Sequence, residues 1–319
     1  MSEERTRAEP SLSLSIVVVT YNPGPILLDC LNSLPQGVGS LPYEVIIVDN
    51  ASQDGTPEHI AQEFPQIQLI VNKDNRGFAT ANNQGLALST GHYMVLLNPD
   101  VIAHPNSLAA MVAFLDDNPG VGIVGPRILD GEGRVTITAR LPPQPMRILG
   151  QFLGVHHLFP GLVYGHYYRA CRRAEEPFDA GWVSGACLML RRAVYTQIGG
   201  LDESLFLYGE EEDFCDRAHN ANWRVHYLPA ASVTHFESST VSRYVQIKIL
   251  SHHISRLYYF RKRGRECAVM ALKIGFAVEL AIKATIRLFQ MVWRRGEGVD
   301  KLRLRIHIYR FVLGEVWRY

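Results

Sequence analysis

The amino-acid sequence predicts an α/β fold, with a mostly parallel sheet flanked by helices and a helical, basic extension at the C-terminus. Short apolar runs that end in turn-forming residues alternate with segments of helical spacing, which is the pattern of a parallel sheet covered on both faces. Residues 241–319 contain 17 Lys and Arg against 5 Asp and Glu, a net charge of +12, which leaves −11 for residues 1–240. The two parts are therefore electrically distinct.

The length and composition are those of a soluble globular protein. The chain has 319 residues, of which 47% are hydrophobic and 20% charged, enough for one large domain or two smaller ones. Residues 1–11 are polar and lack the apolar core of a secretory signal, so we expect them to be disordered. The five cysteines are scattered without CxxC spacing, which predicts reduced thiols in the cytoplasm.

Five strands are predicted in the first part of the chain, each ending in polar or turn-forming residues. They are Ser13–Asn22, Tyr43–Asn50, Ile67–Val71, Tyr93–Leu97 and Val121–Val124. Segments of helical spacing lie between them and begin near Ile26, Thr56, Phe78 and Pro105. Ligands of open α/β sheets bind at the carboxyl ends of the strands, so the polar residues at those ends are candidates for a binding site.

The sequence Asn98-Pro99-Asp100 directly follows the fourth predicted strand. This position puts the Asp100 carboxylate just beyond the carboxyl end of a buried strand. A carboxylate there could hold a divalent metal, and the metal could hold a diphosphate. The alternative is a simple turn, because Asn, Pro and Asp are all turn formers.

Beyond Gly125 the regular alternation stops. We predict a hairpin within Arg127–Ala139 and an irregular segment, Leu141–Arg173, lying over the site. A strand within Asp179–Arg192, a helix starting near Gly209 and a strand at Trp223–Leu228 are predicted after it. The last of these leads to His235, which could complete a metal site with Asp100 or serve a purely structural role.

The densest acidic cluster is Glu210-Glu211-Glu212-Asp213. At helical spacing Glu210 and Asp213 share a face. Acidic residues at a helix start are partly explained by the helix dipole. The apolar residues Leu205–Tyr208 could instead raise the pKa of one carboxylate toward that of a useful general base.

A long helix is predicted at Cys267–Trp293. Its polar residues fall within about a third of the circumference and are Lys273, Glu279, Lys283, Arg287 and Gln290. Four charges make it a poor bilayer span, whereas a wide apolar face with a cationic stripe suits a membrane interface. Packing on its own domain or on a partner chain is the alternative. Lys301–Ile308 alternates with period two, and a strand and a helix both remain open there.

Taken in order and spacing, nine short motifs resemble those of the inverting family 2 glycosyltransferases with the Rossmann-like GT-A fold. They are SIVVVTYN, VIIVDNASQDGT, NRGFATANNQG, LLNPDV, WVSGACLMLRR, GGLDE, LYGEEEDFCDR, NWRVHYLP and VTH. The resemblance covers about residues 12–263 and is greatest to bacterial rhamnosyltransferase-type members that build cell-surface polysaccharide. It implies a catalytic domain at 12–240, with a nucleotide-sugar half (12–125) and an acceptor half (126–240), before the extension at 241–319.

The resemblance also implies roles for individual residues. Those for the nucleotide sugar are Thr20, Tyr21, Asn22, Asp49, Asn50, Ser52, Arg76, Gly77 and Asn98. Among them, Asp49 matches the carboxylate that contacts a pyrimidine base, and Arg76 the loop at the phosphates. Asp54 either belongs to the same motif or only starts a helix. The acceptor-side residues are Trp182, Gly185 and Ala186.

The family's metal and catalytic motifs both depart from the usual pattern here. Asn98-Pro99-Asp100 stands in the place of an Asp-x-Asp motif, so Asp100 is implied as the main ligand of Mg²⁺ or Mn²⁺, with His235 as a second. The motif usually written Glu-Asp-x-Asp falls on residues 210–213. Its first Asp is the family's base, which implies Glu211 in that role. Glu210 is a rival, and Asp213 completes the motif.

The implied reaction is a single displacement, which inverts the anomeric carbon without a covalent intermediate. We expect rhamnose from dTDP-rhamnose as the donated sugar, with UDP-sugars close behind, and a saccharide or lipid-linked saccharide as acceptor. No nucleic-acid partner is expected, and homo-oligomers remain open. The expected location is the cytoplasm, with peripheral contact at the inner face of the cell membrane through 267–293.

Two other enzyme classes and a binding module are the alternatives. A sugar-phosphate nucleotidyltransferase would carry a GxGTRxxP type of loop, whereas YNPGP follows the first strand here. A processive membrane synthase would carry QxxRW and several spanning helices, and the sequence has neither. A non-catalytic nucleotide-sugar-binding module would result if Glu211 does not substitute for Asp.

Overall fold

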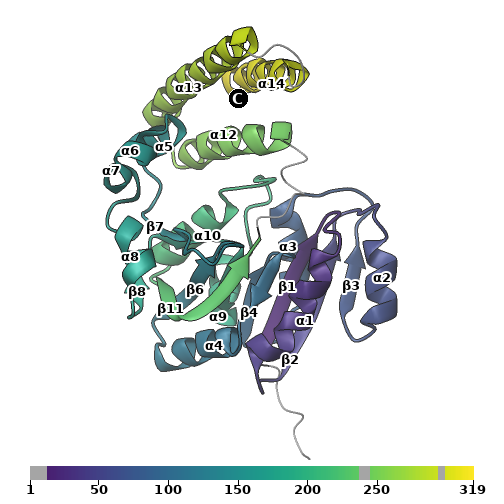
Figure 1. Ribbon diagram of the computed structural model, residues 1–319. Coiled ribbons are helices and arrows are strands. Elements are labelled where there is room, and N and C mark those ends of the chain that lie inside the picture. The colour runs from purple at the N-terminus through teal and green to yellow at the C-terminus, as the bar shows by residue number, and fades with distance from the viewer. Residues whose placement is uncertain (1–12, 237–244, 294–298) are drawn as a thin grey trace, which may run out of the picture. The chain divides into compact units, whose positions relative to one another are not determined.

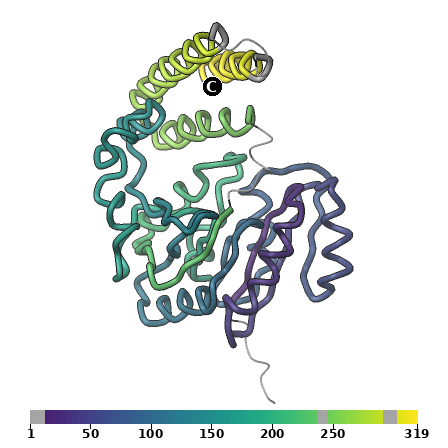
Figure 2. The backbone as a smooth tube through the Cα atoms, in the orientation of Figure 1, coloured from purple at the N-terminus to yellow at the C-terminus, as the bar shows by residue number. Residues whose placement is uncertain are grey.

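The computed structural model describes residues 13–236, 245–293 and 299–319, which form two compact units (Figure 1). Unit 1 contains the described residues of Met1–Arg140, Arg169–Phe206 and Glu211–Ser238. Unit 2 contains those of Leu141–Tyr168, Leu207–Glu210 and Ser239–Tyr319. The backbone trace in Figure 2 shows that each unit is built from segments far apart in the sequence.

Unit 1 is organised around a nine-stranded sheet. Its strands are β1 (Leu14–Thr20), β2 (Tyr43–Asp49), β3 (Gln68–Val71), β4 (Tyr93–Leu97), β5 (Val101–Ala103), β6 (Val121–Leu129), β8 (Phe178–Asp179), β10 (Cys187–Arg191) and β11 (Arg224–His235). Their order is β3-β2-β1-β4-β10-β6-β11-β5, with β8 paired to β11. Two short strands, β7 (Ala139–Arg140) and β9 (Trp182–Val183), pair separately.

The first four strands of this order run parallel, which confirms the prediction for the N-terminal part of the chain. Strand β10 is antiparallel to both of its neighbours, β4 and β6. Strand β11 is parallel to β6 and antiparallel to β5. The carboxyl ends of β1, β2 and β4 consequently meet at one edge of the sheet, and the register pairs Thr20 directly with Asp49.

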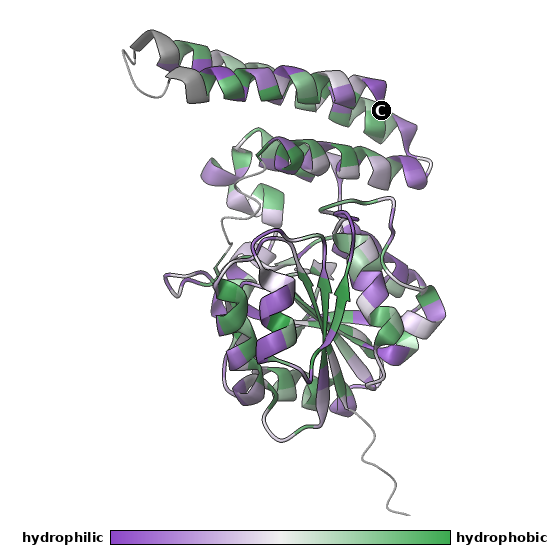
Figure 3. Ribbon diagram, turned by 90° about the vertical axis from the view of Figure 1, so that its right-hand side faces the viewer, coloured by the Kyte–Doolittle hydropathy of each residue, from purple (hydrophilic) through white to green (hydrophobic). Residues whose placement is uncertain are grey.

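Helices cover both faces of this sheet. They are α1 (Ile26–Val38), α2 (Thr56–Glu63), α3 (Phe78–Leu88), α4 (Ser107–Asp117), α9 (Arg192–Ile198) and α10 (Glu210–Asn220). Alternate residues of β1 face opposite sides: Ile16 and Val18 pack with residues of α1 and α4, whereas Val19 packs with Ala81 of α3. The strands at the centre of unit 1 are strongly hydrophobic in Figure 3, as a doubly covered sheet requires.

The predicted hairpin at Arg127–Ala139 is reduced to a single bridge between Leu129 and Val135. Strand β6 continues to Leu129 because it pairs with β11 as far as Thr234. The turn that follows is held by Asp130, whose Oδ1 accepts from the backbone N–H of Glu132 and Arg134 at 2.9 Å each. Parallel pairing of β6 with β11 therefore takes the place of most of the antiparallel hairpin predicted within Arg127–Ala139.

The segment Leu141–Arg173, predicted to be irregular, contains four short helices: α5 (Pro145–Phe152), α6 (Val155–Leu158), α7 (Pro160–Tyr164) and α8 (Tyr167–Arg173). Prolines stand in the first turn of α5 and α7, where a missing N–H costs nothing. Glycines with positive φ, Gly154 and Gly165, separate the helices. The prolines and glycines that suggested an irregular segment are thus the boundaries of short helices.

Unit 2 is helical. Its long helices are α12 (Val245–Lys262), α13 (Glu266–Trp293) and α14 (Val299–Arg318). They share an apolar core with Ile148 of α5, and the fully buried members include Leu257, Phe260, Leu272, Phe276 and Val312. The segment Lys301–Ile308, left open between strand and helix, lies within α14. None of the helices described combines the length and apolar character that crossing a bilayer requires.

Two residues of the polar stripe of α13 turn toward the other helices of unit 2, whereas Lys283 is exposed. Lys273 and Glu279 are buried. His253 of α12 contacts the Glu279 carboxylate through Nε2 at 2.9 Å, and Lys283 forms an ion pair with it. Burial alone would raise the pKa of Glu279, but the hydrogen bonds and charges of His253 and Lys283 hold it below its ordinary value.

Candidate functional site

Two predicted nucleotide residues meet where β1 and β2 end. The Thr20 hydroxyl donates to Asp49 Oδ2 at 2.9 Å, and the Ser52 N–H donates to Asp49 Oδ1 at 2.8 Å. Asp49 and Thr20 are completely buried. The Asp49 carboxylate is therefore held in one orientation by the protein itself.

The loops after these two strands are tied to each other. The Asn22 N–H donates to Ser52 Oγ at 2.8 Å, and Asn22 Oδ1 accepts from the Gln53 N–H at 2.7 Å. Asn22 and Ala51 both have positive φ values, 48° and 68°, which side chains other than glycine rarely adopt. Tyr21, which lies between Thr20 and Asn22 in the chain, is half-buried. Asp54 accepts from the N–H of Gly24 at 3.1 Å, so it joins the same pair of loops besides starting α2.

The loop before α3 reaches the same edge through Asn50. Asn50 Nδ2 donates to the Gly77 carbonyl at 3.1 Å, and Asn50 Oδ1 accepts from Asn72 Nδ2 at 2.8 Å. Asn72 was not among the predicted site residues, although it follows β3 as the other polar residues follow their strands. Arg76 is exposed. Its guanidinium is thus accessible at the position implied for the phosphates.

Asn98, Asp100 and His235 come together at the end of β4. His235 Nε2 lies 3.1 Å from Asp100 Oδ1 and 3.4 Å from Asn98 Nδ2. The Phe236 N–H donates to the Asp100 carbonyl at 3.1 Å, because β11 ends beside β5. The sequence-predicted pair is therefore in contact, although its two members are 135 positions apart in the chain.

This pair offers the donor set of a divalent-metal site, a carboxylate oxygen and an imidazole nitrogen. Asp100 is 4% exposed, and among the described residues no group of three His, Cys, Asp or Glu side chains is arranged to hold a metal. Burial, and to a lesser degree the charge of Asp100, raise the pKa of the nearby Cys30 thiol to about 12. The residues fit a metal completed by ligands from elsewhere.

The acceptor-side residues adjoin this turn directly. The Asn98 N–H donates to the Ala186 carbonyl at 2.9 Å. A Cβ on Gly185 would lie 3.5 Å from Cβ and 3.9 Å from Cδ of Glu211, so the Glu211 side chain lies against the Gly185 backbone. Contacts therefore run without a break from Asp100 through Asn98, Ala186 and Gly185 to Glu211.

The four acidic residues at the start of α10 differ in their surroundings. Glu210, Glu212 and Asp213 are buried, whereas Glu211 is half-buried. Asp213 Oδ2 accepts from Arg217 Nε at 2.8 Å. Trp182 is buried at the β7–β9 pair, with the Arg140 guanidinium 5.3 Å from its ring centroid. Of the four acids, Glu211 is the most accessible to an acceptor.

The segment before α10, residues 199–206, contacts helix α3. The Phe78 N–H donates to the Phe206 carbonyl at 2.8 Å. Asn83 donates to the Leu201 carbonyl at 2.9 Å and to Glu203 Oε1 at 3.0 Å, and accepts from the Leu201 N–H at 2.8 Å. Arg217 of α10 donates to the Gly200 carbonyl at 2.6 Å from the other side.

Asn83, Glu203 and Arg217 were not predicted as functional residues. Asn82 and Asn83 are unusual in a helix interior, and that signal could have indicated a polar partner for α3. Nothing in the sequence identified the partner itself. The contact joins positions 118 to 120 residues apart, which spacing arguments do not reach.

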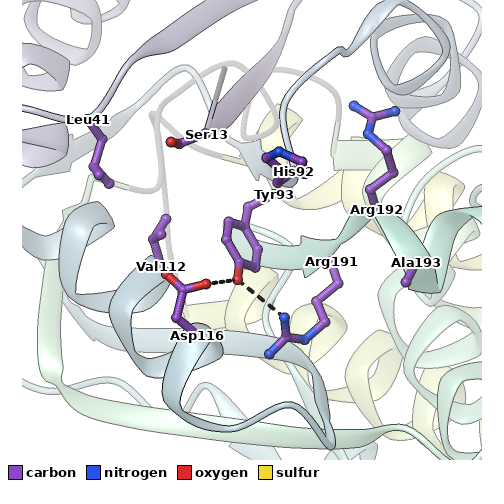
Figure 4. Close-up of a pocket in the computed structure, with 9 residues that line it drawn as sticks. All are labelled: Ser13, Leu41, His92, Tyr93, Val112, Asp116, Arg191, Arg192 and Ala193. Atoms are coloured by element: carbon purple, nitrogen blue, oxygen red, sulfur yellow. Dashed lines mark hydrogen bonds between the residues drawn. The ribbon is translucent and has the colours of Figure 1, made fainter. Parts of the chain in front are cut away.

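A pocket of about 540 Å³ opens near the other end of β4 (Figure 4). Its polar side chains are used by the fold: Arg191 donates to the Val121 carbonyl at 2.7 Å and to Tyr93 Oη at 3.2 Å, and Tyr93 is hydrogen-bonded to Asp116. Arg192 donates to the Gly91 carbonyl at 2.8 Å. The pocket includes none of the predicted site residues, which lie at the carboxyl ends of the strands.

Comparisons with known proteins identify the family of the chain. Residues 15–199 match the profile of the family described as Glycosyl transferase family 2. The chain belongs to that family. An N-acetylglucosaminyl-diphospho-decaprenol L-rhamnosyltransferase of Mycobacterium tuberculosis is 33% identical over 266 residues, covering 78% of this chain and 84% of the relative. The dTDP-rhamnosyl transferase RfbF of Shigella flexneri is 22% identical over 285 residues, 85% of this chain and 83% of the relative.

A solved structure supports the predicted GT-A fold. The mannosyltransferase PcManGT of Pyrobaculum calidifontis, determined in complex with GDP-Man and Mn²⁺, aligns with a TM-score of 0.54 at 18% identity. The alignment covers 94% of this chain and 84% of that structure. At this identity the likeness concerns the fold, and the prediction of a GT-A glycosyltransferase is confirmed.

The first prediction concerns Gly77, whose φ is +83° and whose Cβ, if present, would lie 2.7 Å from the Phe206 carbonyl oxygen. Gly77→Ala should lower thermal stability and weaken nucleotide binding, because the α3 loop and segment 199–206 must separate. Gly55→Ala is the matched control, with a φ of +82° and open space around the added methyl. Gly55→Ala should lower the free energy of unfolding only by the cost of backbone strain, about 1–2 kcal/mol.

Thermal unfolding and nucleotide titration of the two variants measure the difference. Equal losses in Gly77→Ala and Gly55→Ala would contradict a specific contact between Gly77 and Phe206.

Proposed function

We propose that the chain is a metal-dependent inverting glycosyltransferase that moves rhamnose from dTDP-rhamnose to a hydroxyl of a lipid-linked saccharide in cell-surface polysaccharide synthesis. The observation that carries the proposal is the unbroken set of contacts from the Asp100–His235 pair to Glu211. Such a set brings a diphosphate-binding group and a general base to one edge of the sheet. Both relatives are named as rhamnosyltransferases, which supports rhamnose as the transferred sugar. The name of the mycobacterial relative includes a diphospho-decaprenol, which supports a lipid-linked acceptor.

The donor half is assigned to residues 12–125 and the acceptor half to 126–240. Asp49, held by Thr20 and Ser52, contacts the pyrimidine base, while Tyr21, Asn22, Asn50 and the Gly77 loop line the nucleotide. Arg76 offsets charge on the diphosphate. Asp100 and His235 would hold Mg²⁺ or Mn²⁺, which supplies positive charge to the leaving diphosphate when bound.

The chemical step is a direct displacement. Glu211 takes the proton from the acceptor hydroxyl, whose oxygen bonds to the sugar's anomeric carbon as the bond to the diphosphate oxygen breaks. One displacement inverts that carbon, so no nucleophilic carboxylate is needed on the other side of the sugar. The Glu211 side chain lies beside the Gly185 backbone of the acceptor-side segment, with Trp182 and Ala186 nearby in the chain.

An Asp100→Ala substitution should weaken dTDP binding in the presence of Mn²⁺ by about tenfold or more, while leaving thymidine binding unchanged. The chain offers a matched control, since Asp179 forms the other His–Asp contact of unit 1, with His226 Nδ1 at 3.3 Å. Titration calorimetry of Asp100→Ala and Asp179→Ala, with and without chelator, checks this. The metal assignment fails if Asp100→Ala keeps full, Mn²⁺-stimulated dTDP affinity.

A Glu211→Gln substitution should lower the transfer rate by roughly 10²–10⁴-fold with donor binding retained, because only the proton acceptor is lost. Glu210→Gln, which changes the buried neighbour in the same way, should retain transfer. Turnover and donor affinity are measured for both variants with a lipid-linked acceptor. The opposite pattern would pass the role of base to Glu210, and undiminished turnover in both would remove the catalytic assignment of this cluster.

The donor itself can be identified by thermal shift with a panel of nucleotide sugars and Mg²⁺ or Mn²⁺, because a ligand that binds only the folded state raises its stability. We expect the largest shift with dTDP-rhamnose. A larger shift with a UDP-sugar would replace rhamnose in the proposal. If no nucleotide sugar shifts the transition, the donor site assigned to this edge of the sheet is wrong.

A further inference from the structure

Most of the exposed large hydrophobic side chains of the described residues belong to unit 2. Among the described residues, twenty large hydrophobic side chains are exposed, and all but Val71, Leu88, Phe206 and Phe236 belong to unit 2. Helix α13 alone carries seven of them, each between 47% and 65% exposed: Met270, Ile274, Val278, Ile282, Ile286, Leu288 and Phe289. We call these seven residues the α13 stripe.

The α13 stripe is continuous along the helix. Residues from Met270 to Ile286 recur every fourth position, and Leu288 and Phe289 return to the same side at 100° per residue. The stripe thus occupies somewhat under half of the circumference over a length of about 28 Å. Singly exposed hydrophobic residues are ordinary on protein surfaces, but a contiguous apolar band marks an interaction site.

Helix α13 is apolar on its inward side as well as along the stripe, since Val269, Leu272, Phe276 and Leu280 are buried in the core of unit 2. Its inward side also carries buried charge: Lys273 is 8% and Glu279 2% exposed. Lys273 Nζ donates to the Trp317 carbonyl of α14 at 3.4 Å, and Glu279 contacts His253 of α12. The inward side of α13 is therefore covered by the other helices of unit 2, which leaves the exposed stripe for a partner from outside.

The charge exposed on the long helices of unit 2 indicates what that partner is. The charged side chains that are exposed among the described parts of α12, α13 and α14 and their connection are Lys248, Lys262, Arg265, Lys283, Arg303, Arg310 and Arg318, against Glu266 alone. A second copy of this chain would bring the same positive charge, which opposes association. A bilayer containing anionic lipid offers both an apolar interior and a negative surface.

We infer that unit 2 docks on an anionic lipid bilayer through the α13 stripe, with α13 lying along the surface. The cationic side chains then contact lipid headgroups while the stripe enters the boundary of the acyl chains. The inference deepens the proposed function, on which it rests for its purpose, the delivery of a lipid-linked acceptor. Binding to lipid itself does not require transfer to occur.

Flotation of the full-length chain with vesicles tests this. The native chain should bind vesicles of roughly one-third phosphatidylglycerol in phosphatidylcholine. A triple variant, Ile274→Gln, Ile282→Gln and Ile286→Gln, should bind them at least about tenfold more weakly. The matched control is Val71→Gln with Leu88→Gln, which removes exposed apolar side chains of unit 1 and should bind as the native chain does. Vesicles of pure phosphatidylcholine should bind the native chain more weakly.

Undiminished binding by the triple variant would overturn the inference, as would equal binding to both vesicle types. Sedimentation velocity tests the alternative that the α13 stripe binds a second copy of this chain. A native dimer that the triple variant converts to a monomer, with lipid binding unchanged, would assign the stripe to self-association. Nucleotide binding is measured on the same preparations, so that loss of lipid binding with nucleotide binding intact is distinguished from failure of the proposed function.

Discussion

The contact between the loop before α3 and segment 199–206 is the constraint on which the site depends. Gly77 has no side chain, so the Phe206 backbone approaches it closely, and the Phe78 N–H donates to the Phe206 carbonyl. The loop that carries Arg76 and the segment that leads into α10 are consequently one structure. Asn83 and Arg217 hold that segment from two sides, and Arg217 also donates to Asp213 of the acidic cluster.

The polar residues at the strand ends are also held by hydrogen bonds within the protein. Asp49, Asn50 and Ser52 make hydrogen bonds with neighbouring residues of the protein, so the protein itself fixes their orientation. Asp100 and His235 are likewise brought together by the pairing of β11 with β5. The site is thus held in shape mainly by the backbone register of the sheet.

Much of this could be predicted from sequence because it is local. The apolar runs gave the strands of the N-terminal half, and the residues just past Thr20, Asp49 and Leu97 gave the polar edge. The antiparallel insertion of β10 between β4 and β6 could not be predicted, since a five-residue apolar run carries no information on direction. Nor could the partners of Asn83, which lie far away in the chain, or the inward direction of Lys273 and Glu279, which depends on how α12 and α14 pack.

The cysteines have a consequence of practical use. All five lie within the described residues, and four of them are buried, leaving Cys267 exposed at the start of α13. Burial raises the pKa values of Cys30 and Cys215 to about 12, which suppresses their reaction with alkylating reagents. The native chain therefore carries a selective attachment point for a fluorophore beside the α13 stripe, and an environment-sensitive dye there can follow the surroundings of this helix in solution without any engineered mutation.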